Sequence, residues 1–218
     1  LILTMRILLF AATQFEVAPT LQAIRDINWA DDIQVVITGV GLMAATYAIT
    51  KAVATNKPEV MLQAGLAGCI DDSIPLGTTA AVLRESVGDM GVQNGTFTSA
   101  FELGLIKSNE YPWQEGKLVN AHEDLLKGCG LPFVDSVTVN EISTEEDRIS
   151  YYKNRLQAGI ENMEGAALHY VGLMEAVPFL QIRSFSNYIG ERDKSKWALD
   201  SAVEILNLEL QRQLAKLL

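Results

Sequence analysis

The stretch that decides the fold is IENMEGAALHYVGLMEAVPFLQIRSFSNYIGERDKSKW, residues 160–197. Apolar residues recur every three or four positions from Gly165 to Glu175, which predicts a helix. A proline then ends the helix, and the largely apolar segment 179–187 predicts a strand covered by helices on both faces. Glu164 thus begins a helix and Asn187 ends a strand. Ligands in open α/β sheets bind beyond the carboxyl ends of strands, so both are candidate site residues.

Each candidate also has an ordinary structural interpretation. An acid at a helix start, such as Glu164, is favoured by the helix dipole, and Asn187 is a common turn former. Glu16 repeats the pattern near the other end of the chain, where it opens a helix just after a predicted strand at 6–12. Taken singly, none of the three residues establishes a functional site.

A glycine motif follows the second predicted strand, with Gly39, Gly41 and Ala44 spaced as G-x-G-x-x-A. This spacing is similar to the dinucleotide-binding fingerprint, so a nicotinamide or flavin enzyme is an alternative. The fingerprint requires an acid at the carboxyl end of the next strand, whereas Glu59 precedes the next apolar run. We therefore interpret the glycines as a tight turn that lets backbone approach a ligand.

The remaining segments alternate between strand and helix patterns, which predicts one α/β domain spanning 1–218. Predicted strands cover 59–63, 77–83 and 133–139, and predicted helices cover 122–127 and 196 to the C-terminus. The small residues at 64–69 predict a loop whose backbone lies near a ligand, and 85–120 predicts loops with short strands.

Composition excludes several classes of protein. A net charge of −10 disfavours nucleic acid and anionic membrane partners. Two cysteines suit a reducing cytoplasm better than a disulfide scaffold, and two histidines do not make a zinc set. Neither a serine hydrolase elbow nor a P-loop occurs. No metal or cofactor is implied, and the hydrophobic fraction of 49% is compatible with a homodimer or higher homo-oligomer.

Five motifs, in order along the chain, resemble the purine nucleoside phosphorylase/nucleosidase family, which includes methylthioadenosine/S-adenosylhomocysteine nucleosidases. They are FEV at 15–17, TGVG at 38–41, AGLAG at 64–68, NMEG at 162–165 and RSFSN at 183–187. The ending at 186–197 resembles the futalosine hydrolase branch. The resemblance implies a three-layer α/β/α sandwich around a central mixed, partly parallel sheet.

The resemblance also implies a role for each matching residue. Glu164 would grip the ribose hydroxyls, Glu16 would orient and deprotonate the attacking water, and Asn187 would meet the purine. Met163 would pack on the sugar, and Arg183 is a plausible partner of the carboxylates. The other predicted substrate-binding residues are Asn162, Ala67, Gly68, Val139, Asn140, Arg192 and Lys194, the last two for a benzoate at the 5′ end of futalosine.

Asn187 carries substrate information, because an amide suits a 6-oxopurine such as hypoxanthine better than adenine. Gln63 and Leu66 stand where the family's phosphorylases hold phosphate, so water is the expected nucleophile. The predicted activity is release of hypoxanthine from futalosine, leaving dehypoxanthine futalosine, in menaquinone biosynthesis. The alternatives are a methylthioadenosine/S-adenosylhomocysteine nucleosidase, a 6-oxopurine phosphorylase, and a noncatalytic nucleoside-binding or storage protein.

Overall fold

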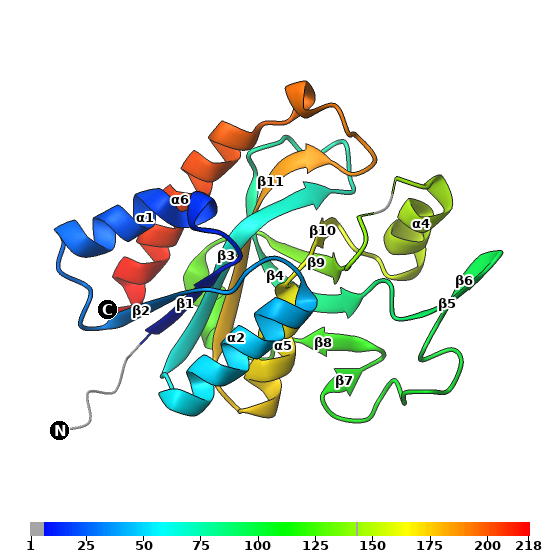
Figure 1. Cartoon of the computed structure of the whole chain (residues 1–218), viewed down its shortest axis with the longest axis horizontal. Helices are drawn as coiled ribbons and strands as arrows, with labels where there is room; N and C mark the ends of the chain where they lie inside the picture. The colour runs from blue at the N-terminus through cyan, green and yellow to red at the C-terminus, as the bar shows by residue number, and fades with distance from the viewer. Residues whose placement is uncertain (1–6, 143) are drawn as a thin grey trace.

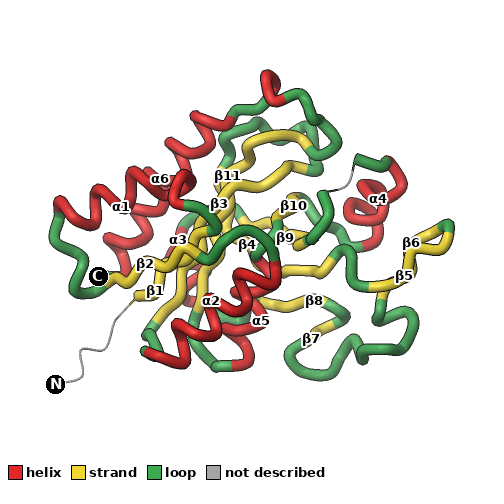
Figure 2. The backbone as a smooth tube through the Cα atoms, viewed as in Figure 1, coloured by secondary structure: helices red, strands yellow, loops and turns green. Residues whose placement is uncertain are grey.

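A mixed sheet of nine strands carries helices on both faces, as Figures 1 and 2 show. The structure is a computed structural model that describes residues 7–142 and 144–218. The helices are α1 (Gln14–Asp26), α2 (Leu42–Thr55), α3 (Glu123–Cys129), α4 (Glu146–Ser150), α5 (Gly165–Met174) and α6 (Leu199–Leu217). The sheet strands are β1 (Ile7–Ala11), β2 (Ile33–Ile37), β3 (Val60–Cys69), β4 (Thr79–Val87), β7 (Trp113–Gln114), β8 (Lys117–Val119), β9 (Phe133–Thr138), β10 (Ile160–Asn162) and β11 (Phe179–Tyr188). A separate hairpin pairs β5 (Gly91–Asn94) with β6 (Thr96–Ser99).

The predicted three-layer architecture is confirmed, and the alternation of side chains along β1 shows why it forms. Leu8 and Phe10 pack with apolar residues of α2 and α5 on one face. Ile7 and Leu9 pack with α1 and α6 on the other. A strand buried on both faces must be apolar at every position, and all five residues of β1 are fully buried.

The prediction of a loop at 64–69 is wrong, because β3 continues through the small residues to Cys69. Its far half pairs with β11 on one side and with β10 on the other. Residues without bulky side chains allow other groups to approach this strand closely. A Cβ at Gly65, for example, would lie 2.5 Å from Nη1 of Arg183.

Strand pairing closes part of the sheet into a ring. β3 pairs with β10, β10 with β9, β9 with β4, β4 with β11, and β11 with β3. Two segments far apart in sequence, β3 and β11, run parallel along nine paired positions, interrupted by a bulge between Phe185 and Asn187. The ring brings polar side chains of β4, β9, β10 and β11 together.

Most other predicted elements are confirmed with shifted ends. The predicted helix at 165–175 is α5, and the predicted strand at 179–187 is β11. The last helix begins at Leu199 instead of Lys196, after a 3-10 turn at Lys194–Lys196. Arg6, the predicted start of the first strand, lies outside the described residues. Among the helices described, none combines the length and apolarity that crossing a membrane requires.

Candidate active site

Glu164 lies between β10 and α5, immediately before the first residue of the helix. One carboxylate oxygen, Oε1, accepts a hydrogen bond of 3.0 Å from the backbone N–H of Gly41. Gly41 has a φ of 94°, which a residue with a side chain rarely adopts, and it caps the start of α2. The glycine turn that is similar to a dinucleotide fingerprint therefore holds a carboxylate of this chain.

Arg183 of β11 binds the second oxygen of Glu164, at 3.4 Å from its Nη1. The guanidinium is almost completely buried. Nη2 donates to Gln63 Oε1 and Asn162 Oδ1, each at 3.1 Å, and Nη1 also donates to the Leu66 carbonyl at 3.3 Å. Arg183 thereby connects β3, β10 and the start of α5 through one side chain.

Glu16 lies in the first turn of α1, and both of its carboxylate oxygens are held. Oε2 accepts from the backbone N–H and hydroxyl of Thr13, at 3.0 and 2.9 Å. Oε1 accepts from the backbone N–H of Leu66 at 3.0 Å. Glu16 Oε1 and Arg183 Nη1 both lie within 3.1 Å of the point a Cβ of Gly65 would occupy. The structure therefore brings Glu16, Glu164 and Arg183 together.

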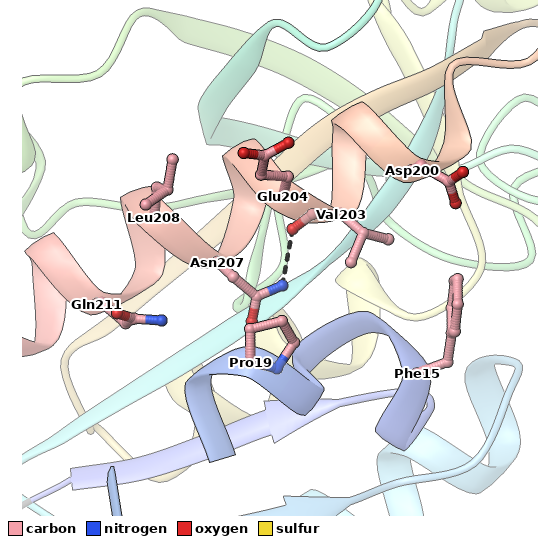
Figure 3. Close-up of a pocket in the computed structure, with 8 residues that line it drawn as sticks. All are labelled: Phe15, Pro19, Asp200, Val203, Glu204, Asn207, Leu208 and Gln211. Carbon is pink, nitrogen blue, oxygen red and sulfur yellow. Dashed lines mark hydrogen bonds between the residues drawn. The ribbon is translucent and has the colours of Figure 1, made fainter. Parts of the chain in front are cut away.

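Asn207 of α6, the helix that packs beside α1 on the same face of the sheet, holds α1 in place. Its Nδ2 donates to the carbonyl of Glu16 at 2.8 Å. Its Oδ1 accepts from the backbone N–H of Thr20 at 3.0 Å and from the Thr20 hydroxyl at 2.7 Å. Figure 3 shows this side chain beside the surface groove between α1 and α6, where it also donates to the Val203 carbonyl. The position of Glu16 thus depends on the C-terminal helix.

Asn187 lies near the end of β11, directly after the bulge, and is paired with Gly68 of β3. Its Oδ1 accepts from the Ser186 hydroxyl at 2.9 Å, and its Nδ2 donates to the Tyr188 carbonyl at 3.0 Å. Glu16 binds Leu66 and Asn187 flanks Gly68, so the two residues meet β3 only two positions apart, roughly 6.6 Å along the strand.

A buried polar network, which the sequence did not reveal, supports these groups from β4. Glu85 is fully buried and accepts from the Thr138 hydroxyl at 2.9 Å and from Asn162 Nδ2 at 3.2 Å. Burial raises the pKa of Glu85 to about 7, although the nearby Arg183 charge and the hydrogen bonds oppose the shift. A Cβ at Gly165 would lie 2.3 Å from Glu85 Oε2, so the glycine of NMEG leaves room for this carboxylate.

The other predicted site residues differ in burial and in their distance from the three central residues. Asn162 is engaged inside the protein, where its Oδ1 accepts from the backbone N–H groups of Glu164 and Gly165 at 2.8 and 2.6 Å. Val139 is fully buried in an apolar cluster, and Asn140 bonds to Asp89. Met163 precedes Glu164 and Gly68 pairs with Asn187, while Ala67 pairs with Phe185. Arg192 and Lys194 lie in the exposed segment before α6.

This arrangement can hold a neutral, hydroxyl-rich molecule. Two carboxylates offer acceptors to hydroxyl groups, and an amide at the end of a neighbouring strand offers both a donor and an acceptor. In the part of the chain that the structure describes, no group of three or more His, Cys, Asp or Glu side chains is arranged to hold a metal ion. Carboxylates and an amide gathered at the carboxyl ends of sheet strands fit an α/β enzyme that binds a small, hydroxyl-bearing substrate.

Comparison with known proteins identifies the family within that class. The profile of the Phosphorylase superfamily matches residues 12–218. The chain is 30% identical over 183 residues to the futalosine hydrolase of Thermus thermophilus. The aligned region covers 82% of this chain and 80% of that protein. The chain therefore belongs to the Phosphorylase superfamily. The prediction that it is a nucleosidase, a hydrolase of N-glycosyl compounds related to the futalosine hydrolases, is confirmed.

Solved structures share the fold at lower sequence identity. A futalosine hydrolase mutant of Helicobacter pylori superposes with a TM-score of 0.78 at 16% identity, covering 97% of this chain and 99% of that one. A methylthioadenosine/S-adenosylhomocysteine nucleosidase of Colwellia psychrerythraea in complex with adenine gives a TM-score of 0.80 at 18% identity, with 98% and 96% covered. These likenesses confirm the predicted fold class.

We expect Glu85 to make stability depend on pH. Its pKa is about 7 in the folded protein against an ordinary 4.5, so the folded state keeps a proton that the unfolded state has lost between those pH values. The free energy of unfolding should therefore fall by roughly 3 kcal/mol as pH rises from 4.5 to 7. Urea unfolding across this range should show the fall in the wild type, and Glu85→Gln should reduce it.

The exposed Glu110→Gln serves as the matched control, and its stability should follow the wild-type pH dependence. Glu85→Gln and wild-type curves that stay parallel from pH 4.5 to 7 would contradict a buried, protonated Glu85.

Proposed function

We propose that this enzyme is a purine nucleoside N-ribohydrolase that cleaves futalosine to hypoxanthine and dehypoxanthine futalosine. One observation carries the proposal: Glu16 binds the Leu66 N–H of β3, Asn187 pairs with Gly68 of β3, and Glu164 is bound by Arg183 of the adjacent strand β11. The 30% identity to a futalosine hydrolase supports the substrate. The predicted place in menaquinone biosynthesis follows from that substrate and is part of the proposal.

Glu164 is proposed to bind the ribose. Cleavage of an N-glycosidic bond builds positive charge on the sugar, and a carboxylate that accepts hydrogen bonds from ribose hydroxyls stabilises that charge. The Gly41 N–H and Arg183 hold this carboxylate on both sides, which restricts its rotation. Met163, the preceding residue, is proposed to pack against the sugar.

Glu16 is proposed to orient the attacking water and accept its proton. Its carboxylate is fixed by Thr13 and Leu66, and a carboxylate oxygen has further lone pairs with which to bind a water molecule. General base catalysis of this kind contributes ~10²–10⁴-fold to the rate.

Asn187 is proposed to bind the leaving base. Its amide Nδ2 can turn from the Tyr188 carbonyl to the 6-oxo group of hypoxanthine, while Oδ1 faces a protonated ring nitrogen. Loss of the base as a neutral molecule requires a proton on the ring, which solvent water supplies because an amide cannot release one. The hydrogen bond from this N–H to Asn187 Oδ1 favours departure of the base.

Water is favoured over phosphate as the nucleophile. Gln63 is engaged with Arg183 and with the Glu164 carbonyl, and the Leu66 N–H is taken by Glu16. A phosphate placed here would face two carboxylates, with the buried Arg183 already bound to one of them. Like charges at close range disfavour phosphate binding. The alternatives of a methylthioadenosine/S-adenosylhomocysteine nucleosidase, a 6-oxopurine phosphorylase or a noncatalytic nucleoside-binding protein predict different outcomes in the assay below.

The benzoate of futalosine is proposed to meet the basic segment before α6. Lys196 is bound to Glu191 at 2.6 Å, whereas the neighbouring Lys194 is exposed. Arg192 stacks on Trp197, with its guanidinium 6.0 Å from the ring centroid. A flexible lysine beside a held arginine suits a carboxylate at the edge of a site.

The enzyme is further proposed to act as a homodimer in the cytoplasm. Val40, Met43 and Tyr47 lie at or near the start of α2 and are 58%, 85% and 69% exposed. Large apolar side chains grouped on one helix indicate a contact surface. They adjoin Gly41, which holds Glu164, so association would stabilise the site. Both cysteines are unbridged and buried, as suits a reducing compartment.

Base release tests the reaction directly. Purified enzyme in phosphate-free buffer should release hypoxanthine from futalosine, and Glu16→Gln should lower kcat by ~10²–10⁴-fold while the dissociation constant for futalosine changes little. Inosine and methylthioadenosine serve as comparison substrates, each with and without phosphate. Dependence on phosphate would make the protein a phosphorylase, preference for methylthioadenosine would make it that nucleosidase, and absence of turnover would favour the binding protein.

The benzoate contact predicts a selective effect on one substrate. Lys194→Ala and Arg192→Ala should raise the Michaelis constant for futalosine by up to about tenfold and leave that for inosine, which has no benzoate, unchanged. Lys127→Ala, on the exposed surface of α3, is the control. Equal effects on both substrates would show that the basic segment does not bind the benzoate.

Association can be measured by sedimentation velocity. The 23.9 kDa chain should sediment as a dimer, and the double variant Met43→Glu, Tyr47→Glu should sediment as a monomer because two charges would be buried in the contact. Leu208→Glu, an exposed position on α6, should remain dimeric. A wild-type monomer at assay concentration contradicts the proposed dimer.

A further inference from the structure

We propose that Glu161 is a second base-reading residue, which accepts a hydrogen bond from N1–H of a 6-oxopurine held on its other side by Asn187. This inference rests on the proposed function, because it assigns a specificity role at the same site. Glu161 is the residue before Asn162 on β10 and is 6% exposed.

The strand pairing places Glu161 and Asn187 on opposite sides of one glycine. Glu161 pairs with Gly68 across the β3–β10 contact, and Asn187 pairs with the same Gly68 across the β3–β11 contact. Paired residues of neighbouring strands project to the same side of a sheet. Because neighbouring strands lie about 4.8 Å apart, the two Cα atoms lie on the order of 10 Å apart.

Gly68 lets other side chains pack closely against β3 at this point. A Cβ there would lie 3.5 Å from Asn187 Nδ2 and 2.8 Å from a methyl carbon of Ile189. The missing side chain therefore allows Asn187 and the apolar Ile189 to approach the strand beside Glu161. Roughly 10 Å between Cα atoms accommodates one flat ring system with a hydrogen bond to each flanking side chain.

Glu161 has an unused carboxylate oxygen. Its Oε2 is buried and finds no hydrogen-bond partner within residues 7–142 and 144–218. The next residue, Asn162, points to the Arg183 and Glu85 network instead, as expected for alternate residues of a strand. A buried carboxylate oxygen without a partner is costly, so a ligand that donates a hydrogen bond there gains affinity.

The charged surroundings allow Glu161 to take either protonation state. Burial and the neighbouring Asp89 carboxylate raise the pKa of Glu161 to about 7, while Arg192 opposes the shift. Tyr152 also faces this carboxylate, and burial raises the pKa of its phenol to about 12, so Tyr152 stays neutral. A donor such as N1–H stabilises the ionised form of Glu161 and lowers its pKa on binding.

The chemistry of the base distinguishes hypoxanthine from adenine at this position. N1 of hypoxanthine carries a hydrogen and donates, whereas N1 of adenine has a lone pair that an ionised carboxylate repels. Asn187 recognises the substituent at position 6 of the purine, and Glu161 recognises the neighbouring N1. Side chains from two different strands would then hydrogen-bond to adjacent positions of the base.

Substrate selectivity tests the inference. Glu161→Leu should lower kcat/KM for inosine by ~10–100-fold, the range for a hydrogen bond to a charged group. Glu161→Gln keeps the size of the side chain and can donate to N1 of adenine, so the ratio of kcat/KM for inosine to that for adenosine should fall. Asp72→Asn removes one exposed charge near the end of β3 and should leave the ratio unchanged.

Calorimetry with the free bases separates recognition from turnover. Hypoxanthine should bind wild-type enzyme more tightly than adenine, with an affinity that weakens below pH 7 as Glu161 becomes protonated, and Glu161→Gln should abolish that pH dependence. If Glu161→Gln leaves both the affinity for hypoxanthine and its pH dependence unchanged, the inference is overturned. Equal losses for hypoxanthine and adenine also overturn it, because they indicate a structural role.

Asn187→Asp distinguishes failure of this inference from failure of the proposed function. This variant should shift preference toward adenosine even if Glu161 has no role. Wild-type enzyme that releases no base from any nucleoside contradicts the proposed function, and the calorimetric comparison still decides the role of Glu161.

Discussion

The buried guanidinium of Arg183 is the interaction on which the rest of the site depends. It contacts Glu164, Gln63, Asn162 and the Leu66 carbonyl, and so joins three strands and the start of a helix. Removing this charge from water costs several kcal/mol unless partners surround it. Glu164 compensates the charge directly, and the nearby Glu85 adds a second carboxylate whose burial favours its protonated form. The contacts with Arg183 and the Gly41 N–H therefore keep the oxygen atoms of Glu164 in a fixed position.

Strand β3 gives residues from opposite ends of the chain a common support. Glu16 arrives from α1, Asn187 from β11 and Glu161 from β10, and each meets a residue between Leu66 and Gly68. Small side chains on β3 make this possible, since a Cβ at Gly65 or Gly68 would collide with groups now packed there. Asn207 on the last helix fixes α1 to the same assembly, so the position of Glu16 depends on a tertiary contact with α6.

Sequence patterns revealed the residues at strand and helix junctions, and the family motifs included Asn162 and Arg183, but neither revealed Glu85 inside the ring. Glu16, Glu164 and Asn187 could be selected because each ends or begins a strongly patterned element. Glu85 begins the segment 85–120, which predicts loops with short strands because it contains glycines and aromatic residues without clear periodicity. Arg84, Glu85 and Ser86 also form a polar run. Those polar residues continue β4 to Val87 because partners on β9 and β10 satisfy them. No pattern within the segment records partners that lie 50 or more residues away.

Side chains alternate between the two faces of the short strand β10, so its neighbouring residues contact different groups. Asn162 turns toward Arg183 and the helix start, and its hydrogen bonds fix Glu164 and Gly165. Glu161, one position earlier, is paired with Gly68 of β3. A one-residue slip of β10 would exchange the two, placing a carboxylate beside Arg183 and an amide against the base. The many bonds of Asn162 therefore fix the register of β10, and with it the chemistry that Glu161 presents to a nucleobase.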